Sequence, residues 1–261
     1  MMRSVLALTT AVLVAVGVVA AARTTISLNG GPLGGPANAA AFDSGDKAKI
    51  GQTIREYLLA NPEVLVEAMQ EYERKQETQR DAVAEKAIKQ YRKELVSDPD
   101  SPIAGNPQGD VTIVEFNDYN CPYCKRAHST MKSVLAADSK IKVVIKDLPI
   151  LGDASKIAAT AALASVKQGK HLAFHNALME FSGRLDRDKI FEIAGKVGLD
   201  IAQLQKDMED GKIKDAIGRN AALASALGVR GTPAFVIGDS FVPGAVDADT
   251  LKQLIAAARK G

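Results

Sequence analysis

The sequence predicts an α/β fold with a helical insertion, preceded by a helical extension. Residues 111–116 and 141–145 are nearly continuous apolar runs, which is typical of buried strands. They flank a helical segment, 121–136, and this strand–helix–strand order predicts a parallel pair. An alanine-rich helical block, 154–227, then separates this unit from two short strands and a last helix.

The N-terminus has the pattern of a secretory signal. Arg3 precedes an uncharged apolar run that ends at Ala22, and small residues suited to cleavage follow. The run is also long enough to span a membrane, so an uncleaved anchor is the alternative. We therefore expect residues 1–22 to be a signal peptide or membrane anchor. Residues 23–41, rich in glycine, proline and alanine, are expected to be a flexible linker.

The composition argues against one class of partner. The chain has 261 residues and a formal net charge of +2, with no basic stripe interleaved with aromatic residues. Since nucleic-acid binding depends on such a basic surface, no nucleic-acid partner is expected.

Residues 42–97 are predicted to form the helical extension. Apolar residues recur at helical spacing from Ile50, and Asn61-Pro62 ends this helix. A second helix, with Asn61 as its N-cap, is expected to run to about Leu95. Its middle, 73–81, is almost wholly polar, so the helix either docks on its own domain or meets other subunits. Of these two interpretations, we expect the second, a homo-oligomer formed through this helix.

Residues 98–261 are predicted to form the second domain. Three prolines and two glycines within 97–110 mark its beginning. Its helical insertion is expected over about 153–228, divided into shorter helices by glycines. A strand over 234–237 follows a Gly-Thr-Pro turn, and a second short strand and a helix complete the chain.

The only two cysteines, Cys121 and Cys124, lie at the start of the predicted crossover helix. The thiolate is the reactive species in disulfide exchange, and a helix N-terminus favours it. We therefore predict that Cys121 is the nucleophile and that Cys124, one turn further, resolves the mixed disulfide. The alternative, a structural staple, is weak because so small a loop contributes only about 2 kcal/mol. Pro122 suits the first helical turn, and Tyr123 completes the motif.

Thr232 and Pro233 are predicted to bind substrate. A proline that begins a strand after a turn is a candidate cis peptide, and the bend would expose the Thr232 backbone to an extended substrate chain. The alternative is an ordinary trans turn.

Glu115 is the third candidate. It shares a strand face with Val111 and Ile113, and a carboxylate buried there is costly unless it has a partner or a task. The task could be to relay the proton of Cys124, and Lys146 is the expected ion-pair partner. The alternative is a solvated glutamate at a strand end.

These motifs resemble one family. Residues 114–124 look like the active-site segment of the DsbA family of exported thiol–disulfide oxidoreductases, and Thr232-Pro233 is similar to that family's threonine–cis-proline loop. The block 154–227 resembles the family's insertion in a thioredoxin-like fold. Residues 43–95 look like the extension of ScsC-type members, which are linked to copper tolerance and include trimers. The resemblance implies a periplasmic protein, free or anchored to the inner membrane, that uses no cofactor.

One departure from the family concerns the strongly oxidising members, which have Pro-His between the cysteines. Here the pair is Pro122-Tyr123, and tyrosine brings no positive charge. The resemblance therefore implies an isomerase or reductase that acts on unfolded or misoxidised proteins and is kept reduced by a membrane partner of DsbD/ScsB type. A DsbA-like oxidase with a DsbB-type partner is the alternative.

Three rival interpretations are less favoured. Cys121 and Cys124 with His171 and His175 have the ligand types of a zinc site, but their spacing is far too wide for a zinc finger. His171 and His175 are instead expected on a helix surface, and His128 is expected to be structural or solvated. The two thiols alone could bind Cu(I). A glutaredoxin shares the Cys-Pro-Tyr-Cys motif but is short and cytosolic. A protein that only binds or assembles with others, without catalysis, is the third alternative, but it would not need the two cysteines.

Overall fold

The computed structural model describes residues 44–260, which form two compact units that divide after Pro62. The signal, anchor and linker predictions for residues 1–41 lie outside the described residues. Across 44–260, none of the helices has both the length and the apolar character needed to cross a membrane.

The first unit contains helix α1, Ser44–Ala60. Asn61 follows its last residue, and the backbone N–H and side-chain amide of Asn61 both donate to the Tyr57 carbonyl, at 2.9 Å each. Asn61 therefore closes α1, whereas the sequence predicts it as the N-cap of the next helix, which begins only at Glu63. Several large apolar side chains of α1 are exposed, including Ile54 and Leu59.

The second unit is built on a five-stranded sheet with the order β1-β3-β2-β4-β5. The central pair β2 and β3 is parallel, as the strand–helix–strand order predicts, and every other neighbouring pair is antiparallel. The sequence analysis missed β1, because its three residues lie within the proline-rich boundary segment. The strands are β1 Ile103–Gly105, β2 Val111–Asn117, β3 Ile141–Asp147, β4 Ala234–Ile237 and β5 Ser240–Pro243.

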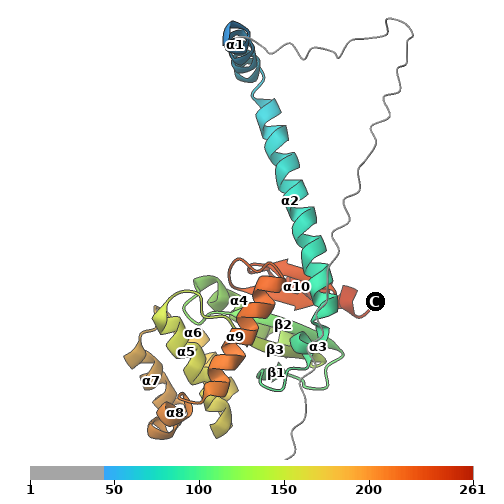
Figure 1. The fold of residues 1–261 in the computed structure, drawn as a ribbon. Helices are drawn as coiled ribbons and strands as arrows, with labels where there is room; N and C mark the ends of the chain where they lie inside the picture. The colour runs from blue at the N-terminus through green and yellow to red at the C-terminus, as the bar shows by residue number, and fades with distance from the viewer. Residues whose placement is uncertain (1–43, 261) are drawn as a thin grey trace, which may run out of the picture. The chain divides into compact units, whose positions relative to one another are not determined.

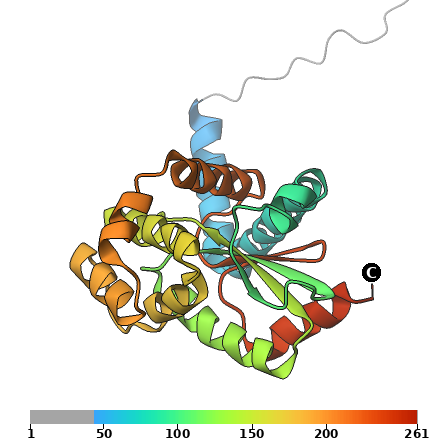
Figure 2. The same ribbon diagram turned by 90° about the horizontal axis from the view of Figure 1, so that it is seen from below.

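Helices cover both faces of this sheet (Figures 1 and 2). Helices α4, Pro122–Ala137, and α10, Ala248–Ala258, pack on one face. The end of α2, Glu63–Gln90, covers the other face with α3, Arg92–Val96, and α9, Gly211–Ala226. Side chains alternate along β2, so that Ile113 belongs to the α4 side and Val114 to the α9 side.

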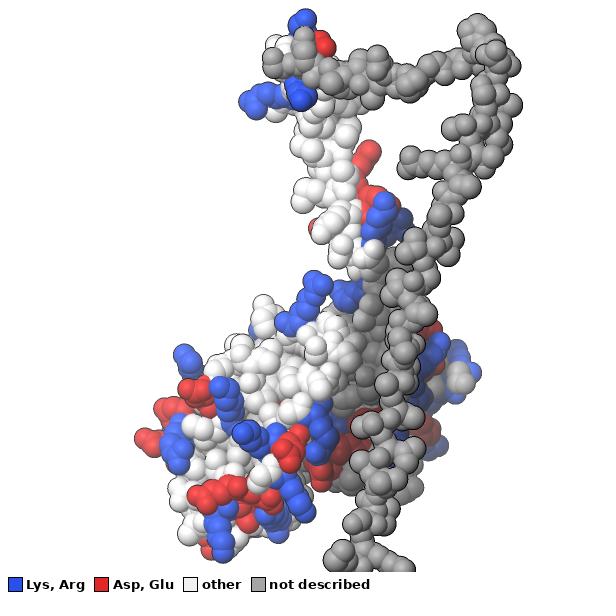
Figure 3. Space-filling model, viewed as in Figure 1, with Lys and Arg blue, Asp and Glu red and all other residues white. Residues whose placement is uncertain are grey.

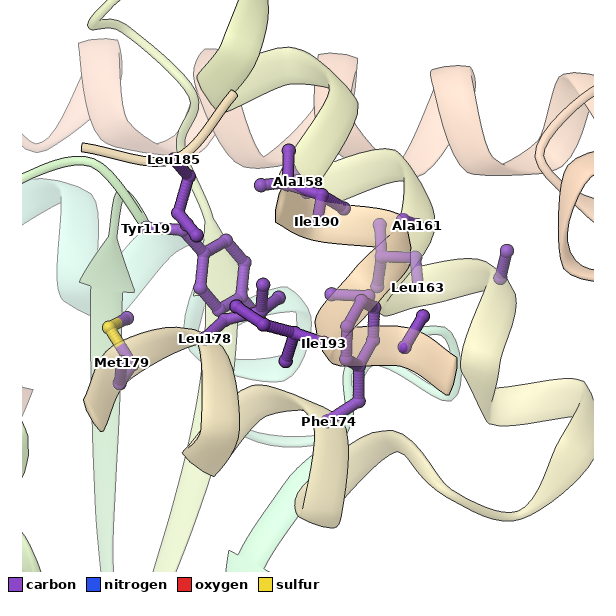
Figure 4. Packing of buried hydrophobic residues seen from close by; sticks show 14 of the residues in the cluster. Tyr119, Ala158, Ala161, Leu163, Phe174, Leu178, Met179, Leu185, Ile190 and Ile193 are labelled. Carbon is purple, nitrogen blue, oxygen red and sulfur yellow. The ribbon is translucent and has the colours of Figure 1, made fainter. Parts of the chain in front are cut away.

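The helical insertion lies between β3 and β4 and has its own core, which Figure 4 shows around Phe174, Leu178, Ile190 and Ile193. Breaks occur at Gly169, Gly183 and Gly198, each of which has a positive φ, whereas Gly211 begins α9 without one. The elements are α5 Asp153–Ala164, a 3-10 turn Ser165–Gln168, α6 His171–Glu180, α7 Arg187–Lys196, α8 Ile201–Asp207 and α9.

The first part of α2 differs from its end. Ala84, Ala87 and Ile88 are buried against the sheet unit, whereas Leu65, Val66, Met69 and Tyr72 are exposed. The helix stops at Gln90, and a separate short helix, α3, carries the buried Leu95. The predicted single helix to residue 95 is thus two helices.

Candidate active site

Cys121 lies at the N-cap of α4, directly after the turn that follows β2. Its backbone is extended, with φ −80° and ψ 117°, and Pro122 then starts the helix with a φ suited to the first turn. The Cys121 thiol donates a hydrogen bond of 3.1 Å to the carbonyl oxygen of Thr232. Both cysteines are free thiols in the structure. The fold therefore brings Cys121 against a loop that is distant in sequence.

The Thr232-Pro233 peptide bond is cis, and β4 begins one residue later. The Pro233 carbonyl accepts a 2.9 Å hydrogen bond from the Gly244 N–H, which fixes the loop to the residue after β5. The carbonyl of Thr232 is thus held toward Cys121. The predicted nucleophile and the predicted substrate-binding loop are adjacent.

A groove of about 360 Å³ opens beside this pair, lined by Tyr123, Thr232, Pro233 and Phe241 among others. Tyr123 is 58% exposed, and the Arg126 guanidinium lies 4.2 Å from its ring centre. The sequence motif predicts no cation at Tyr123, but the stacked Arg126 supplies one at the surface of its ring. An extended chain could lie in this groove with its backbone along Thr232.

Cys124 is fully buried one turn into α4. Burial raises the pKa of the Cys124 thiol well above its ordinary value. Cys124 therefore remains protonated until a base takes its proton, as a resolving cysteine requires.

Glu115 is buried on the same sheet face as α4, and burial raises the pKa of its carboxyl to about 7. Burial also raises the pKa of Asp147, at the end of β3, to about 8. The predicted pairing of Glu115 with Lys146 is wrong. Glu115 is in register with Ile145, so the next residue of β3 points to the opposite face. The Lys146 ammonium instead donates to the Asp98 carboxylate at 2.7 Å and to the Glu94 carbonyl at 2.9 Å.

The three histidines of the chain are buried, which corrects the expectation that His171 and His175 lie on a helix surface. Helix α6 packs between α4 and α5, so the side that carries His175 faces the core. His175 Nδ1 shares a 3.0 Å hydrogen bond with the hydroxyl of Tyr119, whose ring Figure 4 shows inserted among insertion residues. Burial lowers the pKa of His171 to about 4, which favours the neutral ring. Within residues 44–260 no three His, Cys, Asp or Glu side chains are arranged to hold a metal ion, so the zinc set is not assembled.

Asp118 was not singled out from the sequence, although it organises the active-site turn. One carboxylate oxygen accepts from the Asn120 N–H at 2.8 Å and the Ser155 hydroxyl at 2.7 Å. The other accepts from the N–H groups of Ile150 and Leu151, at 2.9 and 3.0 Å. The four bonds fix the turn before Cys121 to the segment after β3. The sequence signal was only a polar turn, which does not reveal burial.

Asn120 and Lys125 connect the same region to the insertion. The Asn120 side-chain oxygen accepts from the Leu185 N–H at 2.7 Å. The Lys125 ammonium donates to the carbonyls of Phe181 and Gly183, at 2.7 and 2.6 Å. The start of α4 is therefore held by the loop between α6 and α7.

The two buried carboxyls lead to a prediction on pH. Because the pKa of Glu115 in the folded protein is raised, the folded state keeps a proton that the unfolded chain has lost between about pH 4.5 and 7. Stability should therefore fall as pH rises through this window, by roughly 3 kcal/mol for Glu115 alone, and Asp147 adds a loss that extends to about pH 8. The free energy of unfolding in urea is measured between pH 4.5 and 8 for the wild type, Glu115→Gln and Asp147→Asn. Its slope against pH should be smaller in both variants than in the wild type. The exposed Glu67→Gln is the control, and an unchanged slope in Glu115→Gln would contradict the assignment.

Comparison with known protein families gives two matches. The DSBA-like thioredoxin domain matches residues 112–256, and the copper resistance protein ScsC N-terminal domain matches residues 46–79. The two matched regions are separate, and together they include most of the described chain.

Solved structures agree with these matches. A thioredoxin-like oxidoreductase from Silicibacter pomeroyi is 48% identical with a TM-score of 0.64, and the alignment covers 65% of this chain and 98% of that one. A linker-deletion variant of Proteus mirabilis ScsC is 31% identical with a TM-score of 0.63, covering 84% and 98%. The Na(+)/H(+) antiporter NhaA 1 of Salinispora arenicola is 27% identical over 63% of this chain, which spans only 26% of the antiporter's length.

Proposed function

From the premise that the chain belongs to the family of DSBA-like thioredoxin domains and is a thiol–disulfide oxidoreductase, we propose that it is exported and acts as a disulfide isomerase or reductase. Cys121 is the nucleophile and Cys124 the resolving thiol. The observation that carries the proposal is the Cys121 thiol at a helix N-terminus, 3.1 Å from the carbonyl of a cis-proline loop that lines an open groove.

The reaction begins when the Cys121 thiolate attacks one sulfur of a substrate disulfide. The substrate S–S bond breaks, a mixed disulfide forms, and the second substrate sulfur leaves as a thiolate. In reduction, Cys124 then loses its proton and attacks Cys121, which yields the Cys121–Cys124 disulfide and a substrate dithiol. In isomerisation, the freed substrate thiolate attacks a second disulfide of the same substrate. The thiolate released there attacks the substrate sulfur of the mixed disulfide, which forms a new pairing and releases Cys121 reduced.

Glu115 is the proposed proton relay for Cys124. A carboxyl with a pKa of about 7 can both accept and return a proton near neutral pH. Glu115 lies on the α4 side of β2 and lines a cavity with His128 and Met131 of that helix. Substrate binding is proposed at Thr232 and Pro233, where the exposed edge of the loop suits backbone pairing.

An isomerase is favoured over an oxidase by Tyr123. No histidine lies between the cysteines to stabilise the Cys121 thiolate. The dithiol state is then less favoured than in strong oxidants, so a membrane reductase of DsbD/ScsB type must maintain it. A DsbA-like oxidase, recharged by a DsbB-type partner, is the second candidate. Residues 1–22 would direct export to the periplasm, with retention as an anchor as the alternative.

A homotrimer through the extension is also part of the proposal. Each unit contributes exposed apolar side chains that a monomer would leave in water: Ile50, Ile54, Tyr57 and Leu59 of α1, and Leu65, Val66, Met69 and Tyr72 of α2. Within α2, Ala87 and Ile88 belong to the apolar cluster on the sheet, whereas the four exposed residues do not. Several reduced Cys121 thiols in one assembly could act together on a misoxidised substrate.

One experiment tests isomerisation and assembly together. The reduced wild type should restore activity to scrambled ribonuclease and sediment as a trimer. Met69→Glu/Tyr72→Glu places charges in the apolar stripe and should give a monomer that still reduces insulin but loses most isomerase activity. Glu67→Gln/Glu73→Gln on the same helix is the control and should behave as wild type. A wild type that cannot refold scrambled ribonuclease would contradict the isomerase proposal.

A further inference from the structure

We propose that the groove beside Cys121 contains a carboxylate-binding subsite formed by Arg80 of α2 and by Arg230. The subsite would make the protein prefer polypeptide disulfides with an acidic side chain close to the reacting cysteine. The inference rests on the proposed thiol–disulfide exchange and adds the substrate class.

The residues that line the groove carry a net positive charge. Two arginines, Arg80 and Arg230, line it together with Tyr123, Thr232 and Pro233, and no aspartate or glutamate is among its lining residues. Arg80 comes from the helical extension, far in sequence from the other lining residues. The extension therefore forms part of the substrate groove, in addition to any role in assembly.

The Arg80 guanidinium has unsatisfied hydrogen-bond donors. Its Nε is buried without a hydrogen-bond partner. The Asp81 and Glu77 carboxylates of the same helix each lie 3.6 Å from the guanidinium, which is ion-pair distance but too long for a hydrogen bond. About a third of the Arg80 side chain is exposed, so an incoming carboxylate can reach the outer nitrogens.

Arg74, six residues earlier on α2, has a guanidinium whose hydrogen-bond donors are satisfied. Its guanidinium donates two hydrogen bonds of 2.8 Å to the two carboxylate oxygens of Glu71. This bidentate pair satisfies the planar fork. Arg74 also does not line the groove. It is therefore a matched control for the charge of Arg80.

Arg230 lies two residues before Thr232, is exposed, and makes no ion pair or hydrogen bond with any residue of the described part of the chain. A substrate chain extended along Thr232 would place its cysteine at Cys121 and its nearby side chains along the groove. An acidic side chain there would meet Arg230 or Arg80 without first displacing a hydrogen-bond partner.

The preference for acidic peptides should be confined to the side of α2 that carries Arg80. The neighbouring hollow is lined by Asp81, Glu85 and Asp239, which would repel a carboxylate. Figure 3 shows a broad face without charged side chains on the sheet unit below the lower end of α2, with basic side chains at its upper edge. A carboxylate is thus attracted to the groove and repelled from the neighbouring hollow.

The test uses two peptides that carry one cysteine as a pyridyl disulfide and differ only in Glu or Gln two residues to either side. The rate of thiopyridone release by the reduced full-length protein is measured for each peptide. It is divided by the rate at which mercaptoethanol releases thiopyridone from the same peptide. The wild type should react roughly two- to fivefold faster with the Glu peptide at low salt. Arg80→Gln and Arg230→Gln should each reduce this ratio, and the double variant should bring it close to one. The Arg74→Gln control should keep it.

The outcomes separate the two proposals. Equal rates for both peptides in the wild type, or an unchanged ratio in the double variant, would overturn the subsite and leave thiol exchange intact. A wild type that attacks neither peptide would instead refute the proposed function. The Glu-to-Gln rate ratio is compared between variants, and not either rate alone, so that a general change in Cys121 reactivity cancels. Arg230→Gln alone keeps the test informative if Arg80→Gln unfolds.

Discussion

Cys121→Ser should abolish disulfide exchange. A serine hydroxyl is not ionised at neutral pH and cannot form a mixed disulfide, so insulin reduction should fall by at least about a thousandfold, to the rate without protein. The fold should persist, because the hydroxyl can donate to the Thr232 carbonyl in place of the thiol. Insulin turbidity and circular dichroism measure the two effects.

Cys124→Ser is the matched variant, since it removes the second thiol and keeps the first. The attack by Cys121 should proceed, and the mixed disulfide should accumulate because nothing resolves it. Non-reducing electrophoresis after mixing with a disulfide substrate should show this adduct only in Cys124→Ser. Substantial turnover by Cys121→Ser, or adducts through Cys124, would contradict the assigned roles.

Asp118→Ala should produce the largest loss of stability. The carboxylate is 1% exposed and accepts four hydrogen bonds, from three backbone N–H groups and the Ser155 hydroxyl. Alanine leaves these buried donors without partners, which should cost roughly 3–5 kcal/mol of the free energy of unfolding in urea. Because the turn before Cys121 is fixed by these bonds, exchange activity should also fall.

Asp153→Asn is the control for this change. Its carboxylate lies at the start of α5, is 90% exposed, and pairs with Lys156. Its loss should change stability by less than about 0.5 kcal/mol. If Asp118→Ala unfolds within 1 kcal/mol of the wild type, the carboxylate does not organise the turn as described.

The fold class could be predicted because its main signals are local. Continuous apolar runs mark β2 and β3, and glycines mark the breaks in the insertion. Ile103–Gly105 could not be recognised, because a three-residue edge strand gives no periodicity and is set by pairing with β3. The break at Tyr91 was missed for a similar reason, since the burial of Leu95 depends on the sheet beneath α3.

The site was predictable only as far as its residues are close in sequence or have strong individual preferences. The cysteine motif and the late proline are of this kind. The pairing of Lys146 with Asp98 joins residues 48 positions apart, and sequence spacing alone suggested Glu115 instead. The contributions of Asp118 and Arg80 arise from tertiary contacts with distant loops, so no pattern along the chain could indicate them.

The buried Lys146 ammonium limits where the chain can be truncated from its N-terminal side. Both of its partners, the Glu94 carbonyl and the Asp98 carboxylate, precede the first strand of the sheet. A chain shortened to begin at β1 would lose both partners of this ammonium and, with α3, the buried Leu95 that packs on the same face of the sheet. The smallest autonomous catalytic fragment must therefore start upstream of α3, and truncation boundaries for recombinant work should be chosen there.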